Sequence, residues 1–308
     1  MASVLTVTLN PTIDVFGQAA TVRPTHKVRL DGTTYEPGGG GINVSRMIRE
    51  LGGTTTALAL SGGEMGAFLA RLLAEEGIAF QPVPIQGQTR VAFMVRDRSS
   101  GLEYRFVPEG PQVTAADIER CIAAIDMRLE GYVVASGSLP VGAPPESYLD
   151  LARAAQRNGL CFVLDSSGPG LKAALDHGGL FLVKPSRSEL EAYAGRKLDD
   201  TGVSRMAADL VSAGKSRLVA VTLGEEGALL ASPEGVIRLP AIPVEVRSAV
   251  GAGDSFLGAM VWALSQSWPL REAFRLGLAA GAAATSNPGV TLCRKKDVLA
   301  LYAKAPAC

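Results

Sequence analysis

The sequence predicts an α/β protein with a central, mostly parallel sheet and helices on both faces of that sheet. Short apolar runs recur along the chain after residue 36, and segments with helical periodicity separate them. Strands that are apolar on both sides need cover on both faces, and strands that alternate with helices run mostly parallel. The length of 308 residues allows one large α/β domain with an appendage, or about two domains.

The elements follow in order along the chain. The apolar runs predict buried strands at residues 57–61, 132–136, 160–165, 180–184 and 218–223. The periodic segments predict helices at residues 42–51, 64–76, 114–129, 145–158, 186–194 and 203–213. Thr114 followed by Asp117 is a capping-box pattern at the start of the third helix. Beyond residue 227, the pattern predicts a hairpin (228–231 and 236–239), a strand at 244–247 and helices at 253–266, 269–286 and 294–304.

Two segments, residues 12–36 and 88–108, interrupt the alternation because they are strand-like with no helix between strands. Residues 91–95 and 102–106 flank a Ser-Ser-Gly turn and predict a β-hairpin. We expect the two segments to form a small sheet, inserted as a lid into a single domain that spans residues 1–308. An edge meander without function remains an alternative on pattern alone.

Composition argues against several classes of function. Lys plus Arg and Asp plus Glu number 30 each, so the chain lacks the long-range field that nucleic-acid or anionic-membrane binding uses. The N-terminus has no basic signal-peptide segment, no transmembrane helix is expected, and four cysteines without CxxC spacing indicate reduced thiols in a cytoplasm. With two histidines, a zinc site or a Ser-His-Asp triad has little room, so carboxylates would perform acid–base chemistry.

Four glycines at 38–41 stand directly before a predicted helix, and Asn43 lies in its first turn. Glycines in this position let the backbone approach a ligand closely and direct amide donors at it. The alternative is a flexible turn, but a linker would not lead straight into an amphipathic helix.

A second glycine motif, Gly251-Ala252-Gly253-Asp254, opens the predicted helix 253–266. Amides and the helix dipole at this end would stabilise a phosphoryl group, and the carboxylate of Asp254 would take a proton from a hydroxyl. Phosphoryl transfer needs little more than positioning, charge neutralisation and such a base. The alternative is a carboxylate that only complements the helix dipole.

Basic residues gather in the predicted lid: Lys27, Arg29, Arg90 and Arg105. They would clamp an anionic substrate or, alternatively, protect sheet edges from aggregation. Asp14 follows the first strand in a predicted loop, where its carboxylate suits a pair of sugar hydroxyls; a solvated loop aspartate is the alternative.

The chain resembles the ribokinase/PfkB family of carbohydrate kinases over essentially its whole length. The resemblance is carried by residues 248–255 (SAVGAGDS), by the glycine run with Asn43, and by residues 8–14 (TLNPTID), 136–140 (SGSLP) and 182–185 (LVKP). It implies a ribokinase-like fold and places the chain in the phosphosugar branch. Gly40, where 1-phosphofructokinases and tagatose-6-phosphate kinases usually carry lysine, and residues 104–107 and 291–293 favour the 6-phosphofructokinases of this branch.

The resemblance implies roles residue by residue. Asp254 would deprotonate the C1 hydroxyl of fructose 6-phosphate, beside an anion hole of Gly251, Ala252 and Gly253. The sugar phosphate would be bound by Asp14, Lys27, Gly38, Gly39, Gly40, Asn43, Arg90, Arg105 and Ser138. ATP would lie along Lys184, Ser186, Thr222, Gly224 and Gly227, with Mg²⁺ held indirectly by Glu189. A monovalent cation such as K⁺ would contact Ser248, Val250, Ala284, Asn287, Gly289 and Thr291. A homodimer through the lid sheet is expected.

Two departures from the family pattern stand out. Ser186 replaces an asparagine three residues before Glu189, which puts its contact with the metal's water shell or the phosphates in doubt. Ala249 replaces a common threonine but leaves the backbone amides in place.

Two other classes of function, an oxidoreductase and a non-catalytic sugar-binding protein, fit the sequence less well. A dinucleotide-dependent oxidoreductase would need Gly-x-Gly-x-x-Gly after the first strand, and residues 8–13 contain none. A non-catalytic sugar-binding protein would not need Asp254 together with both glycine loops.

Overall fold

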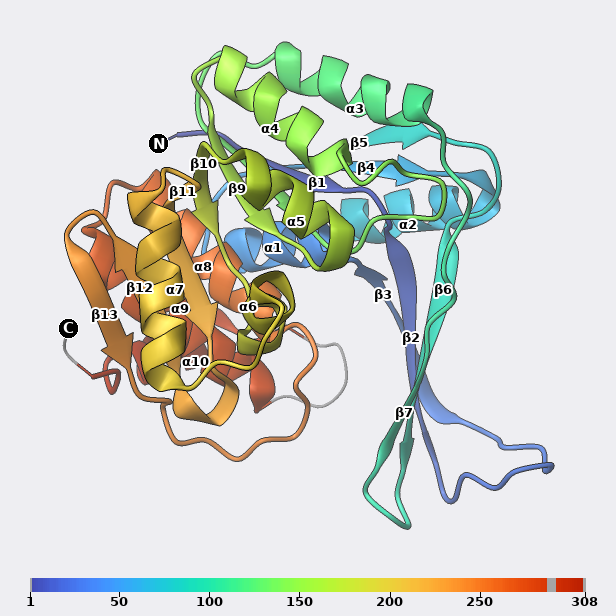
Figure 1. Ribbon diagram of the computed structural model, residues 1–308. Coiled ribbons are helices and arrows are strands. Elements are labelled where there is room, and N and C mark those ends of the chain that lie inside the picture. Colours follow the sequence, from blue (N-terminus) through green and yellow to red (C-terminus); the bar gives the residue numbers. More distant parts are fainter. Residues whose placement is uncertain (1, 287–291, 307–308) are drawn as a thin grey trace.

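The computed structural model describes residues 2–286 and 292–306, and within them one large sheet forms the body of the protein (Figure 1). Its strand order is β13-β12-β11-β10-β9-β8-β1-β4-β5. The strands from β11 to β5 in this order run parallel, and β12 runs antiparallel to both of its neighbours, β11 and β13. The bounds are β1 Val4–Thr8, β4 Thr56–Ser61, β5 Ala79–Pro84, β8 Tyr132–Ser136, β9 Cys161–Asp165, β10 Leu180–Val183, β11 Ser216–Thr222, β12 Ala228–Ser232 and β13 Gly235–Leu239.

Helices cover both faces of this sheet. One apolar core joins the sheet to α3 (Ala115–Asp126), α4 (Ser147–Arg157), α5 (Gly168–His177), α6 (Arg187–Ala194) and α7 (Asp200–Ser212). The core on the opposite face joins it to α1 (Gly40–Glu50), α8 (Ala252–Ser265), α9 (Leu270–Thr285) and α10 (Lys295–Tyr302). A third apolar cluster packs α2 (Gly63–Glu75) against β4 and the second sheet. The α/β fold class is therefore confirmed, with the mostly parallel sheet that the pattern predicts.

The second sheet has the strand order β3-β2-β6-β7 and projects from the body (Figure 1). Its strands are β2 (Thr12–Ala19), β3 (Asp31–Gly38), β6 (Arg90–Asp97) and β7 (Glu103–Phe106). The segments 12–36 and 88–108 therefore pair with each other, and β6 and β7 form the predicted hairpin. This four-stranded structure is called the lid sheet below.

The predicted strand at 244–247 is wrong. The segment joins no ladder, because the amide of Arg247 donates to Thr285 O at the end of α9 and Val246 is exposed. The capping box of Thr114 and Asp117 is present at the start of α3. None of the helices in the described parts of the chain combines the length and apolar character that crossing a bilayer requires.

Candidate active site

The site lies at the carboxyl ends of four neighbouring parallel strands. Thr8 ends β1, Ser136 ends β8, Asp165 ends β9, and Lys184 follows β10. Ligands bind at this edge of open α/β sheets because the loops there are free of the ladder and helix N-termini point toward them.

The N-terminus of α8 points into the same region. Gly251 stands at its N-cap with a positive φ of 71°, a conformation that favours glycine, and Asp254 lies in its first turn. A Cβ on Gly253 would stand 3.2 Å from Nζ of Lys184, so the Lys184 ammonium lies beside the first turn of the helix. The amides and this ammonium together make a site for negative charge.

Asp254 is held in place by neighbours from two other elements. Its Oδ2 accepts a hydrogen bond from Nδ2 of Asn43 at 2.8 Å, and its Oδ1 lies 3.5 Å from the Ser136 hydroxyl that donates to it. Burial raises the pKa of its carboxyl, while the Asn43 hydrogen bond and the Lys184 charge act in the opposite direction. A raised pKa with a fixed orientation is what a general base needs.

Lys184 is 4% exposed and forms an ion pair with Asp165 at 3.0 Å. Burial disfavours the ammonium, but Asp165, Glu189 and Asp254 outweigh it and raise the pKa of Lys184. Burial also raises the pKa of the Asp165 carboxyl to about 6, although Lys184 works against the shift. The lysine is therefore a fixed positive charge surrounded by carboxylates.

A cavity of about 280 Å³ opens between this edge and the lid sheet. It is lined by Thr12, Asp14, Gly39, Asn43, Arg90, Ala92, Phe93, Met94, Arg105, Val107, Ala249, Val250, Gly251 and Asp254. The structure thus brings the predicted base, the glycine loops and two predicted lid arginines around one cavity.

Asp14 lies on strand β2 and not in a loop, so that part of the sequence prediction is wrong. It is in register with Glu36 of β3 and Ala92 of β6, which hold it extended between two neighbouring strands. Burial raises the pKa of its carboxyl to about 6, against the charges of Arg46, Arg90 and Arg105.

Arg90 is fixed by backbone oxygens. Its Nη1 donates to Pro108 O at 2.9 Å, and its Nη2 donates to Asn10 O at 3.0 Å. Its Nε is buried without a partner among the described residues. Burial lowers the pKa of this guanidinium and Asp14 works against the shift, so an anion beside Arg90 would relieve an incompletely compensated charge.

The glycine run allows the loop to pack closely against the strand ends. A Cβ on Gly38 would stand 2.1 Å from Asp14 Oδ2, and a Cβ on Gly40 would stand 2.2 Å from Ser136 Oγ. Gly39 has a φ of +110° and is the N-cap of α1. The glycines are therefore required for this packing, and they set the entry of α1, which carries Asn43.

The residues predicted to bind ATP begin at Lys184 and continue along the neighbouring strand ends. Ser186 forms a parallel bridge with Thr222, which precedes a short 3₁₀ turn at Gly224–Glu226. Ser186 and Glu189 form a capping box at the start of α6: Ser186 N donates to Glu189 Oε2 at 2.7 Å, and Glu189 N donates to Ser186 Oγ at 3.3 Å. Both side chains therefore have a helix-capping role, whatever else they contact.

Some predicted residues lie outside the cavity. Lys27 is exposed in the loop between β2 and β3, and Ser138 is exposed but accepts from Asn10 Nδ2 at 3.5 Å. Of the predicted cation-site residues, Ser248 donates to Glu103 Oε2 at 3.3 Å, Val250 lines the cavity, and Ala284 is buried in α9. Asn287, Gly289 and Thr291 lie outside the described residues.

Sequence reasoning missed Ser136 and Asp165, which the structure places at the site, and Arg46, whose charge acts on Asp14 from outside the cavity. Ser136 and Asp165 are the last residues of strands that the apolar pattern located, so the rule for carboxyl ends of parallel strands was an available signal. Arg46 had no such signal, because its ion-pair partners Glu36 and Glu76 come together only in the fold.

Comparison with proteins of known sequence agrees with this arrangement. The model of the family described as pfkB family carbohydrate kinase matches residues 8–297. The ATP-dependent 6-phosphofructokinase isozyme 2 of Mycobacterium tuberculosis is 40% identical over 298 residues, which cover 96% of this chain and 87% of that protein.

Solved structures agree over the whole length. Phosphofructokinase-2 from Escherichia coli in complex with potassium has a TM-score of 0.95 to this chain, and its complex with fructose-6-phosphate has a TM-score of 0.93. In both comparisons the identity is 38% and 99% of each chain is covered. The family model, the sequence identity and the shared fold all lead to the same conclusion: the chain belongs to the pfkB family of carbohydrate kinases.

Proposed function

We propose that this protein transfers the γ-phosphoryl group of ATP to the C1 hydroxyl of fructose 6-phosphate, which gives fructose 1,6-bisphosphate and ADP. The observation that carries the proposal is the position of Asp254, half-buried in the first turn of α8 and facing a cavity with two lid arginines. The relatives named 6-phosphofructokinase, and the relative bound to fructose-6-phosphate, support this choice of substrate.

Asp254 acts as the base in this proposal. It accepts the proton of the C1 hydroxyl as the oxygen attacks the γ-phosphorus, and the bond from phosphorus to the ADP oxygen breaks. The amides of Gly251, Ala252 and Gly253 stabilise the charge of the moving phosphoryl group, with Lys184 beside them.

The sugar phosphate occupies the cavity of about 280 Å³. The carboxylate of Asp14 accepts hydrogen bonds from sugar hydroxyls, and the amide of Asn43 donates to one. Arg90 and Arg105 neutralise the 6-phosphate. The unpartnered Nε of Arg90 supports a role in anion binding. Roles for Lys27 and Ser138 remain predictions, since neither side chain lines the cavity.

ATP lies along Lys184, Ser186 and the turn from Thr222 to Gly227 in this proposal. Three carboxylates, Asp165, Glu189 and Asp254, act on the Lys184 ammonium. This excess of negative charge fits Mg²⁺, which would neutralise the phosphates and hold them in line. A monovalent cation at the loop of Ser248 and Val250 is supported by the potassium complex of the E. coli relative.

We further propose a homodimer through the lid sheet. Tyr35, Phe93 and Phe106 lie on one cross-strand row with Val15 and are 52%, 45% and 58% exposed. Exposed aromatic side chains in one row are typical of an interface.

In this proposal residues 1–308 form one kinase domain with this sheet as its lid. The three described cysteines are free thiols, which is consistent with a protein that acts in a reducing cytoplasm.

The test is ADP release under identical Mg-ATP with fructose 6-phosphate, fructose 1-phosphate and tagatose 6-phosphate. We expect the highest kcat/KM on fructose 6-phosphate. A much higher kcat/KM on fructose 1-phosphate or tagatose 6-phosphate would show that the proposed substrate is wrong but that the protein is still a sugar-phosphate kinase. An absorbance change with NAD(P)H and no ADP release would favour the oxidoreductase alternative.

A further inference from the structure

Arg46 is a buried charge that the proposed mechanism does not use. It lies on α1 three residues after Asn43, so the two side chains share one side of the helix. Asn43 reaches Asp254, whereas Arg46 reaches toward the lid sheet. Helix α1 therefore serves both the base and the sheet that covers the sugar.

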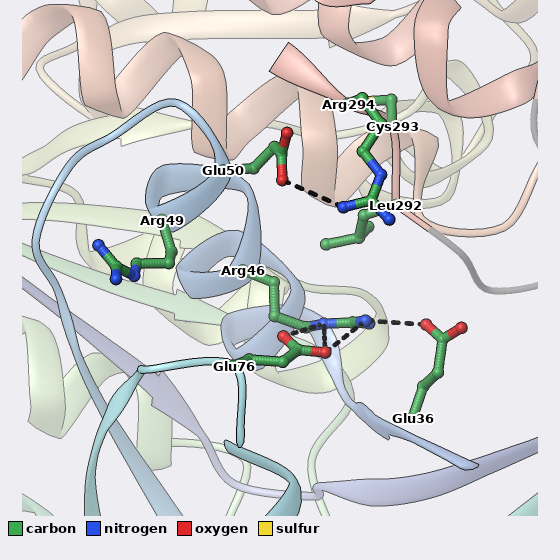
Figure 2. A pocket seen from close by; sticks show the side chains of 8 residues that line it. All are labelled: Glu36, Arg46, Arg49, Glu50, Glu76, Leu292, Cys293 and Arg294. Carbon is green, nitrogen blue, oxygen red and sulfur yellow. Dashed lines mark hydrogen bonds and ion pairs between the residues drawn. The ribbon is translucent and has the colours of Figure 1, made fainter. Parts of the chain in front are cut away.

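The guanidinium of Arg46 is clamped between two glutamates (Figure 2). Its Nε donates to both carboxylate oxygens of Glu76, at 3.1 and 2.8 Å, and its Nη2 donates to Glu36 Oε2 at 2.8 Å. Glu76 caps α2 and Glu36 belongs to lid strand β3. Arg46 thus ties three separate elements together through its planar fork.

The clamp lies beneath the sugar-binding carboxylate. Glu36 is the cross-strand partner of Asp14, so both side chains leave the same face of the lid sheet. Nη1 of Arg46 donates to Pro37 O at 3.3 Å, and the next residue, Gly38, has its backbone against Asp14 Oδ2. The Pro37–Gly38 end of strand β3 therefore lies between Arg46 and Asp14.

Arg46 does not line the substrate cavity. It lines a second cavity of about 560 Å³ with Glu36, Arg49, Glu50, Glu76, Leu292, Cys293 and Arg294 (Figure 2). Any effect of Arg46 on sugar binding must therefore act through Asp14 and the Pro37–Gly38 end of β3. It is the strongest of the three arginine charges that lower the pKa of Asp14 against burial, ahead of Arg90 and Arg105.

We propose that Arg46 is a positioning residue of the sugar site, which holds the Pro37–Gly38 end of strand β3 beside Asp14 and keeps this carboxylate charged to accept hydrogen bonds from sugar hydroxyls. The inference rests on the proposed function for its kinetic part only. The charged groups around Asp14 are Arg46 from α1, Glu36 from β3, Arg90 from β6, Arg105 from β7 and Asp254 from α8.

The test compares Arg46→Met, Arg46→Lys and the matched control Arg49→Met, which removes an exposed arginine from the same helix. Arg46→Met removes a charge that favours ionised Asp14, so Asp14 would take up a proton at higher pH. For a rise of about one pK unit from about 6, the ionised fraction of Asp14 at pH 7 falls from about 0.9 to about 0.5, so we expect KM for fructose 6-phosphate to rise about twofold while KM for ATP stays unchanged. Arg46→Lys keeps the charge without the fork, so its KM lies between those of wild type and Arg46→Met.

A second readout does not require kinase activity. The carboxyl ¹³C resonance of Asp14, assigned with Asp14→Asn, reports its titration directly. The midpoint should move up in Arg46→Met and stay in place in Arg46→Lys and Arg49→Met. A wild-type midpoint and sugar KM in Arg46→Met would overturn the proposal; if that variant does not fold, a raised midpoint in Arg46→Lys would do so. Absent turnover on fructose 6-phosphate with the expected titration would instead overturn the proposed function alone.

Discussion

Asn43 and Asp254, which are 211 residues apart in the chain, are joined by a hydrogen bond of 2.8 Å from Nδ2 to Oδ2. Asn43 lies in the first turn of α1 and Asp254 in the first turn of α8. The bond therefore joins the two glycine loops at one point, with two helix N-termini directed at the same cavity. Among the described residues, only the Ser136 hydroxyl donates to Oδ1 of Asp254, so this oxygen can also accept a hydrogen bond from a substrate hydroxyl.

Replacement of Asn43 by Ala removes the donor that orients Asp254. Hydrogen bonds to charged groups contribute about 1.5–3 kcal/mol, so we expect kcat to fall by about 10- to 150-fold at saturating substrates. Steady-state ADP release checks this, with Asn158→Ala, at the C-cap of α4, as control. A kcat within twofold of wild type would show that Asp254 does not depend on this contact.

Replacement of Asp14 by Asn should stabilise the protein while it weakens sugar binding. The folded-state pKa of about 6 lies above the usual value of 3.8, so the ionised form destabilises the fold. The stability gained by Asp14→Asn is absent below about pH 3.8 and complete above about pH 6, where it reaches about 3 kcal/mol. Urea unfolding at pH 4 and pH 7.5 measures it, with Asp31→Asn as a control at an exposed lid carboxylate. Equal stability of wild type and Asp14→Asn at pH 7.5 would be against this account.

Replacement of Lys184 by Met should destabilise the fold as well as impair ATP use. The lysine is buried with Asp165, and loss of one partner from a buried pair costs about 3–5 kcal/mol because the other charge is left uncompensated. The double variant Lys184→Met/Asp165→Asn should regain most of that stability but not the activity. Lys172→Met, which removes an exposed ion pair with Asp176, is the control. Restored turnover in the double variant would remove Lys184 from the phosphoryl site.

Replacement of Phe106 by Asp should disrupt the proposed dimer. The side chain stands at the end of the exposed aromatic row of the lid sheet, and a carboxylate there would be buried without a partner in the interface. Sedimentation velocity should show a shift from dimer to monomer. Leu129→Asp, at an exposed apolar residue outside the lid sheet, should leave the distribution unchanged. A monomeric wild type would refute the dimer.

The strands that the sequence reveals are those with the simplest surroundings. β8, β9, β10 and β11 lie inside the sheet, and burial on both faces makes their apolar runs continuous. β5 escaped detection because it contains Pro82 and Pro84, which disfavour a strand. The sheet accepts them because β5 is an edge strand paired only with β4.

The residues of the candidate site also differ in how far the sequence could predict them. Both glycine motifs are local, so their residues were predictable from a few neighbouring positions. Asp165 and Arg46 depend on partners from other elements: Lys184 for the first, Glu36 and Glu76 for the second. Such pairs carry no local pattern, because only the packing of helices on the sheet brings the charges together.

The most direct test of the account is the turnover of Asp254→Asn on fructose 6-phosphate. The amide keeps the shape of the side chain but cannot accept the proton of the C1 hydroxyl. We predict that kcat falls by several orders of magnitude while KM for ATP stays near that of wild type and the melting temperature does not fall. Asp297→Asn, a carboxylate on α10, serves as the control. Near-wild-type kcat in Asp254→Asn would contradict its role as the base.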